Sequence, residues 1–517
     1  MRGSWVASTL WLAVASCAVE VGEPIAHHAS ARHEVDAGMD AEQSSDVEPS
    51  GPSAPSGMES GSSEGSETRT ERRNASDAVD AGSKAKRNKD TQPVKPTESA
   101  SAPAQSTREM TATEPVQGDD DAGAGPAAPQ EQATLVGLGE RLFRDPSLSL
   151  TGTQSCSSCH EDQSAFTGSA DRERPHFPVS RGAPDGKLGT RNTPTAMYAK
   201  FSPPFAFVED TEEPGEYTPT GGLFWDGRVS SLSDQAAKPF VNPREMALPD
   251  VPAVIERVRK AGYVWMFEPL FGPDPLDDLN QAFRHVTDAI AAFERTPRFS
   301  PFSSKFDAYL RGQAELSAQE ARGFELFKDP EKANCIACHV GTVESREPRD
   351  WLFTDFTYDN LGVPRNLQIT DNAAPDYFDL GLCQSEGVMS KIPQVIADPA
   401  AFLASLCGAF KVPTLRNIAK TAPYMHNGYF DQLRDVVDFY VTRETEPARW
   451  YPSAMDGTVQ KYNDLPEQYR ANVNTTEVPY DRKLGEQPRL SPEEIDAVVA
   501  FLSTLSDGYE ATSAAKP

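Results

Sequence analysis

Apolar residues recur at intervals of three and four positions in several stretches of the chain, and this spacing collects them on one face of an α-helix. In the last of these stretches Ser491 and Glu494 have the spacing of a capping box, which starts a helix. The apolar face of that predicted helix consists of Ile495, Val498, Val499 and Leu502. Ser317 and Glu320 predict the start of another helix in the same way.

A third predicted helix carries a tyrosine among its apolar residues. Its buried face has the i, i+3, i+4, i+7 spacing and consists of Leu433, Val436, Val437 and Tyr440. Tyr440 is therefore expected to point inward. Strand-like alternation of apolar and polar residues is scarce, whereas Gly and Pro between the helices are plentiful. The pattern as a whole predicts an all-α fold with long loops.

Two copies of the pentapeptide Cys-x-x-Cys-His lie between these helices. They are Cys156-Ser-Ser-Cys159-His160 and Cys335-Ile-Ala-Cys338-His339. This pentapeptide is the attachment site of c-type haem, in which the thiols bind the vinyl groups and the histidine is the proximal iron ligand. A zinc site would need further ligands at suitable spacing, and a thiol-redox pair does not need the histidine. We therefore expect two covalently bound haems.

A similar segment precedes each pentapeptide. Gly139-Glu-Arg-Leu-Phe-Arg-Asp-Pro146 precedes the first, and Gly323-Phe-Glu-Leu-Phe-Lys-Asp-Pro330 precedes the second. A short helix, a turn and a haem site have thus been used twice. The repeat predicts two cytochrome-c-like haem domains in tandem, over residues 132–299 and 300–511.

Three cysteines remain outside the pentapeptides. Cys17 ends Val14-Ala-Ser-Cys17 after a basic and then apolar N-terminus, which predicts a lipoprotein signal over residues 1–17 and a lipid on Cys17. An ordinary secretory signal is the alternative. Either signal leads to an oxidising compartment, here the periplasm. The lipoprotein signal would also anchor the protein to the outer membrane through the lipid. There Cys383 and Cys407 are expected to form a disulfide, with two free buried thiols as the alternative.

Composition limits what the rest of the chain can do. Residues 18–131 contain no aromatic residue and are rich in Ser, Ala, Glu, Asp, Gly and Pro, so they cannot bury enough apolar surface to fold and are predicted to be a disordered tether. No apolar run is long enough to span a bilayer, which leaves the lipid as the expected membrane contact. The formal net charge of −28 argues against nucleic acid and suits a basic or weakly charged redox partner.

Further motifs lie between and after the pentapeptides. The first group is Phe224-Trp-Asp-Gly-Arg228, Ser231-Leu-Ser-Asp-Gln235 and Asn242-Pro-Arg-Glu245-Met246. The second group is Lys411-Val-Pro-Thr-Leu-Arg-Asn417 and Thr421-Ala-Pro-Tyr-Met-His426-Asn-Gly428. With these motifs the chain, from about Leu135 to Leu505, resembles the bacterial di-haem cytochrome c peroxidases and, within them, the MauG-type enzymes.

The resemblance implies a peroxide-binding pocket at the first haem, with His160 as proximal ligand. Gln235 lies 10 residues after Trp225 and Glu245 lies 20 after it, as the distal glutamine and glutamate do in the family. Peroxide cleavage needs a base that moves a proton and donors for the departing hydroxide, and these residue types suit both tasks. Trp225 is implied to lie between the two haems and to pass electrons.

The second axial ligand of the second haem is implied to be Tyr440. It lies 14 residues beyond His426, where classical members have a methionine and MauG-type members have a tyrosine. Met425 is a competing ligand. A methionine raises the haem potential, whereas a tyrosine oxygen favours oxidising chemistry over storage of an electron.

Two further expectations concern His176 and a calcium ion. His176 lies 16 residues after His160, as the classical distal histidine does, but counting back from Gly189-Thr-Arg-Asn-Thr-Pro194 places that histidine in a segment without one. We therefore expect His176 to be a surface residue and the first haem to be open. The resemblance also implies a calcium ion, which is a hard cation suited to oxygen ligands, at Asn192, Thr421 and Pro423.

These observations predict a di-haem c-type peroxidase that reduces hydrogen peroxide to water with electrons from a small cytochrome c or cupredoxin. One alternative is a MauG-like oxidase that modifies aromatic residues of a partner protein. A different alternative is a di-haem electron carrier, which would have no need of an acid–base pair at Gln235 and Glu245.

Overall fold

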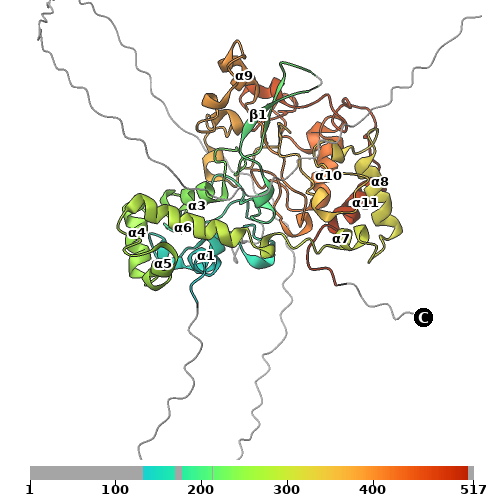
Figure 1. Cartoon of the computed structure of the whole chain (residues 1–517). Helices are drawn as coiled ribbons and strands as arrows, with labels where there is room; N and C mark the ends of the chain where they lie inside the picture. The colour runs from blue at the N-terminus through green and yellow to red at the C-terminus, as the bar shows by residue number, and fades with distance from the viewer. Residues whose placement is uncertain (1–131, 169–176, 185, 212, 511–517) are drawn as a thin grey trace, which may run out of the picture. The chain divides into compact units, whose positions relative to one another are not determined.

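The computed structural model describes residues 132–168, 177–184, 186–211 and 213–510. The regular structure of this part is mainly α-helical, joined by long loops, with two short two-stranded sheets (Figure 1). The predicted signal over residues 1–17 with Cys17, the predicted tether over residues 18–131, and His176 all lie outside the described residues.

The larger helices form two groups (Figure 1). The first group comprises α1 (Leu135–Arg144), α2 (Cys156–Cys159), α3 (Leu232–Val241), α4 (Val251–Lys260), α5 (Val264–Phe271) and α6 (Leu279–Glu294). The second group comprises α7 (Lys305–Leu310), α8 (Ala318–Lys328), α10 (Leu433–Thr442) and α11 (Pro492–Ser503). A further helix, α9 (Pro399–Ser405), packs against strand β1 through the rings of Phe402 and Phe207, whose centres are 5.4 Å apart.

The sequence repeat corresponds to a repeated helix crossing. In the first group α1 packs on α6, and in the second α8 packs on α11. A Cβ atom on Gly139 would lie 1.9 Å from the carbonyl oxygen of Ala289, and one on Gly323 would lie 1.9 Å from that of Ala497. Both crossings therefore require glycine, because any side chain would push the helices apart.

Aromatic side chains fill the same places in both crossings. The ring centres of Phe143 and Phe293 are 5.4 Å apart, and those of Phe327 and Phe501 are 5.3 Å apart. All four residues are at most 2 % exposed. Truncating any of them to alanine is expected to destabilise its helix pair by about 3–5 kcal/mol.

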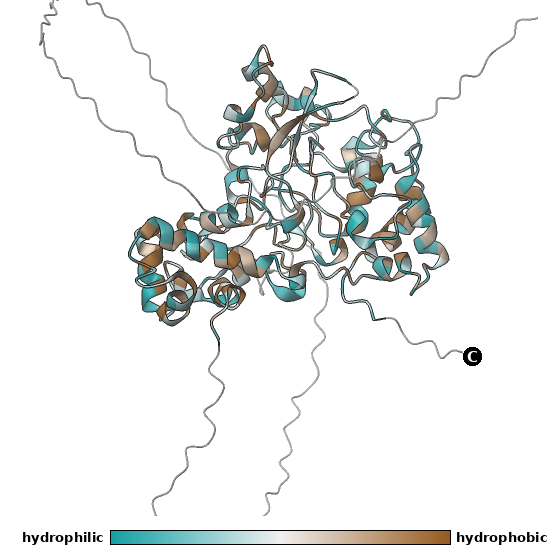
Figure 2. Ribbon diagram, in the orientation of Figure 1, coloured by the Kyte–Doolittle hydropathy of each residue, from teal (hydrophilic) through white to brown (hydrophobic). Residues whose placement is uncertain are grey.

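The predicted helix starts are confirmed. In α8 the Ser317 amide donates to a Glu320 carboxylate oxygen at 2.7 Å, while the Glu320 amide donates to the Ser317 hydroxyl at 3.3 Å. Ser491 and Glu494 form the same capping box at the start of α11. Most helices carry hydrophobic and hydrophilic residues on different sides (Figure 2), as amphipathic helices packed on a core do. Within the described residues, no helix combines the length and the apolarity needed to cross a membrane.

The all-α expectation holds only approximately, because two short antiparallel sheets are present. Strands β1 (Ala206–Glu209) and β2 (Tyr217–Thr220) form a hairpin, while β3 (Tyr358–Asp359) and β4 (Phe410–Lys411) join distant segments. β1 is mostly exposed and β3 and β4 have two residues each, so none of these three shows a regular alternation of buried and exposed positions. Cys383 and Cys407 are joined in a disulfide in the second half of the chain.

Candidate active site

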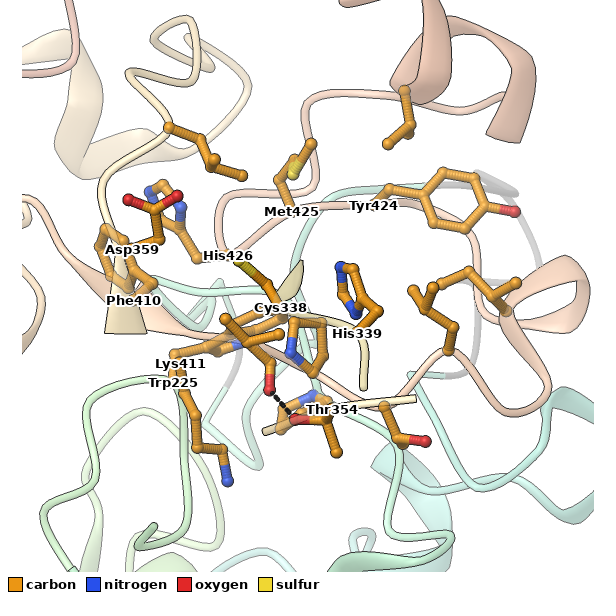
Figure 3. A pocket seen from close by; sticks show the side chains of 18 of the residues that line it. Trp225, Cys338, His339, Thr354, Asp359, Phe410, Lys411, Tyr424, Met425 and His426 are labelled. Atoms are coloured by element: carbon orange, nitrogen blue, oxygen red, sulfur yellow. Dashed lines mark hydrogen bonds between the residues drawn. The ribbon is translucent and has the colours of Figure 1, made fainter. Parts of the chain in front are cut away.

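A large, mainly apolar cavity contains the histidines of both pentapeptides. His160 reaches it from the end of α2, and His339 from the loop after α8. Figure 3 shows His339, Cys338, Met425 and Trp225 among the side chains around this cavity. An apolar space with a few placed polar groups is the usual form of a cofactor site.

Both histidines are oriented for metal binding through the same ring nitrogen. Nδ1 of His160 lies 2.8 Å from the carbonyl oxygen of Phe166, and Nδ1 of His339 lies 3.1 Å from that of Phe353. Because a carbonyl only accepts, Nδ1 carries the proton in each ring and Nε2 keeps its lone pair. Burial lowers the pKa of both histidines, which favours the neutral, ligating form.

None of the four pentapeptide cysteines is in a disulfide. Burial raises the pKa of Cys159 to about 11 and that of Cys335 and Cys338 to about 12, and it raises the pKa of Cys156 further. Two thiols and a histidine nitrogen at each end of an apolar cavity fit a covalently bound haem. The described residues contain no group of three or more His, Cys, Asp and Glu side chains placed to bind a metal ion.

The residues predicted for the distal side of the first haem lie on and after α3. Ser231 caps this helix by accepting from the Asp234 amide, and Gln235 one turn later lines the cavity together with His160. Glu245 follows α3. Its charge contributes to the raised pKa of Cys159, which indicates that the carboxylate lies towards the first pentapeptide.

Glu245 is a stronger base than an ordinary glutamate. Burial raises its pKa, and the opposing effects of Arg228 and Asn242 are smaller. A carboxylate with a raised pKa binds a proton more readily, which suits it to accept and return one.

Trp225 is held by both halves of the chain. Its indole nitrogen donates to the carbonyl oxygen of Asn192 at 2.8 Å, and its own carbonyl accepts from the Lys411 amide at 2.9 Å. The side chain lines the cavity that contains both histidines (Figure 3). That Trp225 lies between the two sites stays a prediction.

Tyr440 and Met425 both line the cavity with His339, so both predicted candidates are near the second site. Leu433, Val436 and Val437 line it as well, and the predicted face of α10 therefore points into the cavity. Burial is the largest cause of the raised pKa of the Tyr440 phenol, and the charge of Asp359 is the next largest. Cys338 and Cys335 add to this rise, which indicates that the phenol lies near the second pentapeptide.

The positions predicted for calcium are partly brought together. The side-chain amide of Asn192 lies against the carbonyl oxygen of Pro423 and 3.4 Å from that of Met425. Thr421 lines the same cavity. An amide and neighbouring carbonyl oxygens are ligands that suit a hard cation.

The sequence interpretation missed Glu294, a buried carboxyl group in the cavity wall. One of its oxygens has no hydrogen-bond partner, and burial raises its pKa to about 8 against a smaller opposite effect of Arg295. Glu294 follows Phe293 in α6 as Leu502 follows Phe501 in α11, and both residues line the cavity. When the two helix crossings are aligned, the first site has the carboxyl group of Glu294 where the second has the apolar side chain of Leu502.

Lys411 is a second residue that the sequence interpretation did not assign to the site. Its ammonium group donates to the carbonyl oxygen of Gly222 at 2.7 Å, and it lines the cavity beside Trp225 (Figure 3). Burial lowers its pKa to about 8, and the charge of Asp226 opposes this effect.

Two sites of this kind on one cavity are those of a di-haem c-type protein. The family model of the di-haem cytochrome c peroxidases matches residues 133–315. The methylamine utilization protein MauG of Paracoccus denitrificans is 38% identical over 393 residues, which cover 74% of this chain and 90% of that protein. The chain therefore belongs to the di-haem cytochrome c peroxidase family.

Two further relatives agree with this assignment. The crystal structure of a diheme peroxidase from Burkholderia thailandensis is 36% identical, with a TM-score of 0.66, and covers 74% of this chain and 88% of that one. A cytochrome c peroxidase of Escherichia coli is 31% identical over 57% of this chain and 50% of its own. The predictions of an oxidoreductase and of two haem c cofactors are confirmed by the family, which excludes the zinc interpretation and disfavours a mere electron carrier.

Proposed function

We propose that this protein reduces hydrogen peroxide at the first haem and receives electrons through the second. The observation that carries the proposal is the difference between the two sites. Gln235 lines the cavity and Glu245 lies towards Cys159 of the first pentapeptide, whereas Tyr440 lies towards Cys335 and Cys338 of the second. In a di-haem electron carrier both irons would be coordinatively saturated, and the first site would have no need of an acid–base pair.

Three residues would have separate roles in the reaction at the first haem. His160 would hold the iron through Nε2, and the haem, when bound, would supply the redox centre for peroxide cleavage. Glu245 takes the proton from the nearer peroxide oxygen and returns it to the farther one, which leaves as water. Gln235 donates a hydrogen bond to the departing oxygen and stabilises its negative charge.

The second haem would be bound by His339 and Tyr440 and would exchange electrons with the first through Trp225. The duplicated helix crossings support two cytochrome-c-like domains, which we place at residues 132–299 and 300–511. The position of Tyr440 near Cys335 and Cys338 supports it as the second ligand, with Met425 as the alternative.

A MauG-like oxidase remains the second candidate. It is favoured by the 38% identity to a methylamine utilization protein and by Tyr440 at the second site. Such an enzyme would use peroxide to oxidise aromatic residues of a partner protein, not to consume donor electrons.

Turnover with a soluble donor separates the two candidates. The holoprotein, mixed with hydrogen peroxide and a reduced small cytochrome c or cupredoxin, should oxidise two donor molecules for each peroxide consumed. A holoprotein that consumes peroxide only slowly with every donor tested, but forms long-lived oxidised spectra, would contradict the peroxidase and favour the oxidase.

Three finer features belong to the proposal. We place the mature protein in the periplasm, attached to the outer membrane by a lipid on Cys17, and a Cys17→Ser protein should then appear in the soluble periplasmic fraction. Calcium at Asn192, Thr421 and Pro423 would join segments that lie more than 200 residues apart. Removal of the ion with a chelator should lower the melting temperature, and added Ca²⁺ should restore it.

A further inference from the structure

Tyr198 and Asn417 hold equivalent places in the two halves of the chain. Each immediately precedes a one-turn 3-10 helix, over Ala199–Phe201 and Ile418–Lys420. The Tyr198 amide donates to the carbonyl oxygen of Phe299 just after α6, and the Asn417 amide donates to that of Leu505 just after α11. Both residues have left-handed backbone, with φ of 61° and 64°.

Asparagine suits this backbone conformation, but tyrosine does not. The left-handed region is enriched in Asn, because its short polar side chain bonds locally, and it strains residues with a bulky side chain. Strained residues persist where the surrounding structure holds them in place, as it also does at Phe302 and Tyr462. The first half of the chain thus has a strained tyrosine at the position where the second half has an asparagine that suits the backbone.

The side chain of Tyr198 connects the haem cavity to a carboxylate. Its ring lines the cavity that contains His160 and His339, and the residue is 2 % exposed. Its hydroxyl donates to Oδ2 of Asp507 at 2.8 Å and accepts from the Phe302 amide at 3.1 Å. Burial, the largest effect, raises the pKa of the phenol.

These surroundings favour loss of an electron together with a proton. Once a phenol loses an electron it becomes a strong acid, and a positively charged radical would be unstable here because the guanidinium carbon of Arg416 lies 4.9 Å from the ring centre. Asp507 provides a base at hydrogen-bond distance. By contrast, the indole N–H of Trp225 faces a carbonyl oxygen, which does not take up its proton.

We propose that Tyr198 is a redox-active tyrosine that gives an electron to the haem centres when peroxide arrives without an external donor. This inference rests on the proposed peroxide reaction. In the step the phenol O–H bond breaks, the proton forms an O–H bond on Asp507, and a neutral tyrosyl radical remains. The electron is one of the two that reduction of hydrogen peroxide to two waters consumes, and the haem centres retain the other oxidising equivalent. Two electrons from a donor protein later complete the cycle: one reduces the haem centres, and the other returns the tyrosyl radical to the phenol as Asp507 gives back the proton.

Rapid-freeze electron paramagnetic resonance tests the proposal on the holoprotein. The oxidised protein is mixed with hydrogen peroxide in the absence of donor, with and without ring-deuterated tyrosine. We expect a radical signal that narrows on deuteration, is lost in Tyr198→Phe, and is strongly reduced in Asp507→Asn. Tyr198→Asn places in this backbone the residue found at the equivalent position, and it should also lose the signal; because it empties the space of a buried ring, Tyr198→Phe is the main test.

Tyr462 provides the matched control, because its hydroxyl also donates to a carboxylate, that of Glu444 at 2.6 Å, but it is not part of the cavity wall. Tyr462→Phe should keep the signal. A parent protein without a tyrosyl signal, a signal that survives Tyr198→Phe, or a signal lost only in Tyr462→Phe would overturn the proposal. An unchanged signal in Asp507→Asn would overturn the proton transfer.

Haem absorption in the same samples separates this inference from the proposed function. If peroxide changes the haem spectrum but no tyrosyl radical forms, only the role of Tyr198 is wrong. If the haem spectrum does not respond to peroxide, the proposed function is wrong and the radical proposal falls with it.

Discussion

Replacement of Glu294 by glutamine should make the protein more stable near neutral pH. The carboxyl group is buried in the cavity wall with one oxygen unpartnered, and burial raises its pKa to about 8 from 4.5. The unfolded chain therefore releases this proton at a much lower pH than the folded one. Because the folded state holds more protons, stability falls as the pH rises from below 4.5 towards 8. Glutamine has the shape of the protonated acid but no proton to lose.

The size of the effect follows from the pKa difference. One pKa unit corresponds to about 1.4 kcal/mol, so the ionisation penalty amounts to roughly 3 kcal/mol near pH ~7 and roughly 1 kcal/mol near pH ~5. Glu294→Gln should remove this penalty, and its advantage over the parent protein should shrink by the same amounts on acidification. Haem bound in the cavity would also exclude water from the carboxyl group, and this desolvation raises the pKa in the same direction.

Denaturant unfolding of the holoproteins at the two pH values measures the difference. Glu325→Gln is the control, because Glu325 is 66% exposed and pairs only with the neighbouring Lys328. An exposed pair contributes little, so this variant should stay within about 1 kcal/mol of the parent at both pH values. A Glu294→Gln protein that is no more stable than the parent near neutral pH, or whose advantage does not shrink in acid, would refute the reasoning.

Three further predictions concern catalysis and the second haem. Glu245→Gln should lower peroxidase turnover by about 10²–10⁴-fold with both haem spectra intact, and turnover within a few-fold of the parent would make Glu245 a purely structural residue. Turnover of the parent should rise with pH through the raised pKa of Glu245, so its acid limb should lie at higher pH than that of an ordinary glutamate; a flat profile in acid would contradict this role. Tyr440→Met should raise the potential of the second haem in a potentiometric titration, whereas Met425→Leu should leave it unchanged. The opposite pair of results would make Met425 the ligand.

The sequence predicted those features that depend on spacing within one segment. Both pentapeptides, the capping boxes of α8 and α11, and the face of α10 that carries Tyr440 are local patterns, because a helix places residues three and four apart on one side. The distal residues required more, since Gln235 and Glu245 became recognisable only through the family spacing from Trp225.

Features that depend on contacts across the chain were not predictable. Tyr198 and Asp507 are separated by 309 positions, and no spacing rule relates them. The difference between Glu294 and Leu502 appears only when the crossings of α6 and α11 with their partner helices are compared. The short strands were missed because most of them lack the alternation by which a longer strand is recognised.

The electron paramagnetic resonance spectrum of the oxidised holoprotein tests the central claim most directly. We expect the haem of His160 to have an open position and the haem of His339 to have two protein ligands. The spectrum should therefore contain one high-spin and one low-spin haem in equal amounts. Two low-spin haems, unchanged on partial reduction, would show that peroxide has no iron to bind and would contradict the peroxidase.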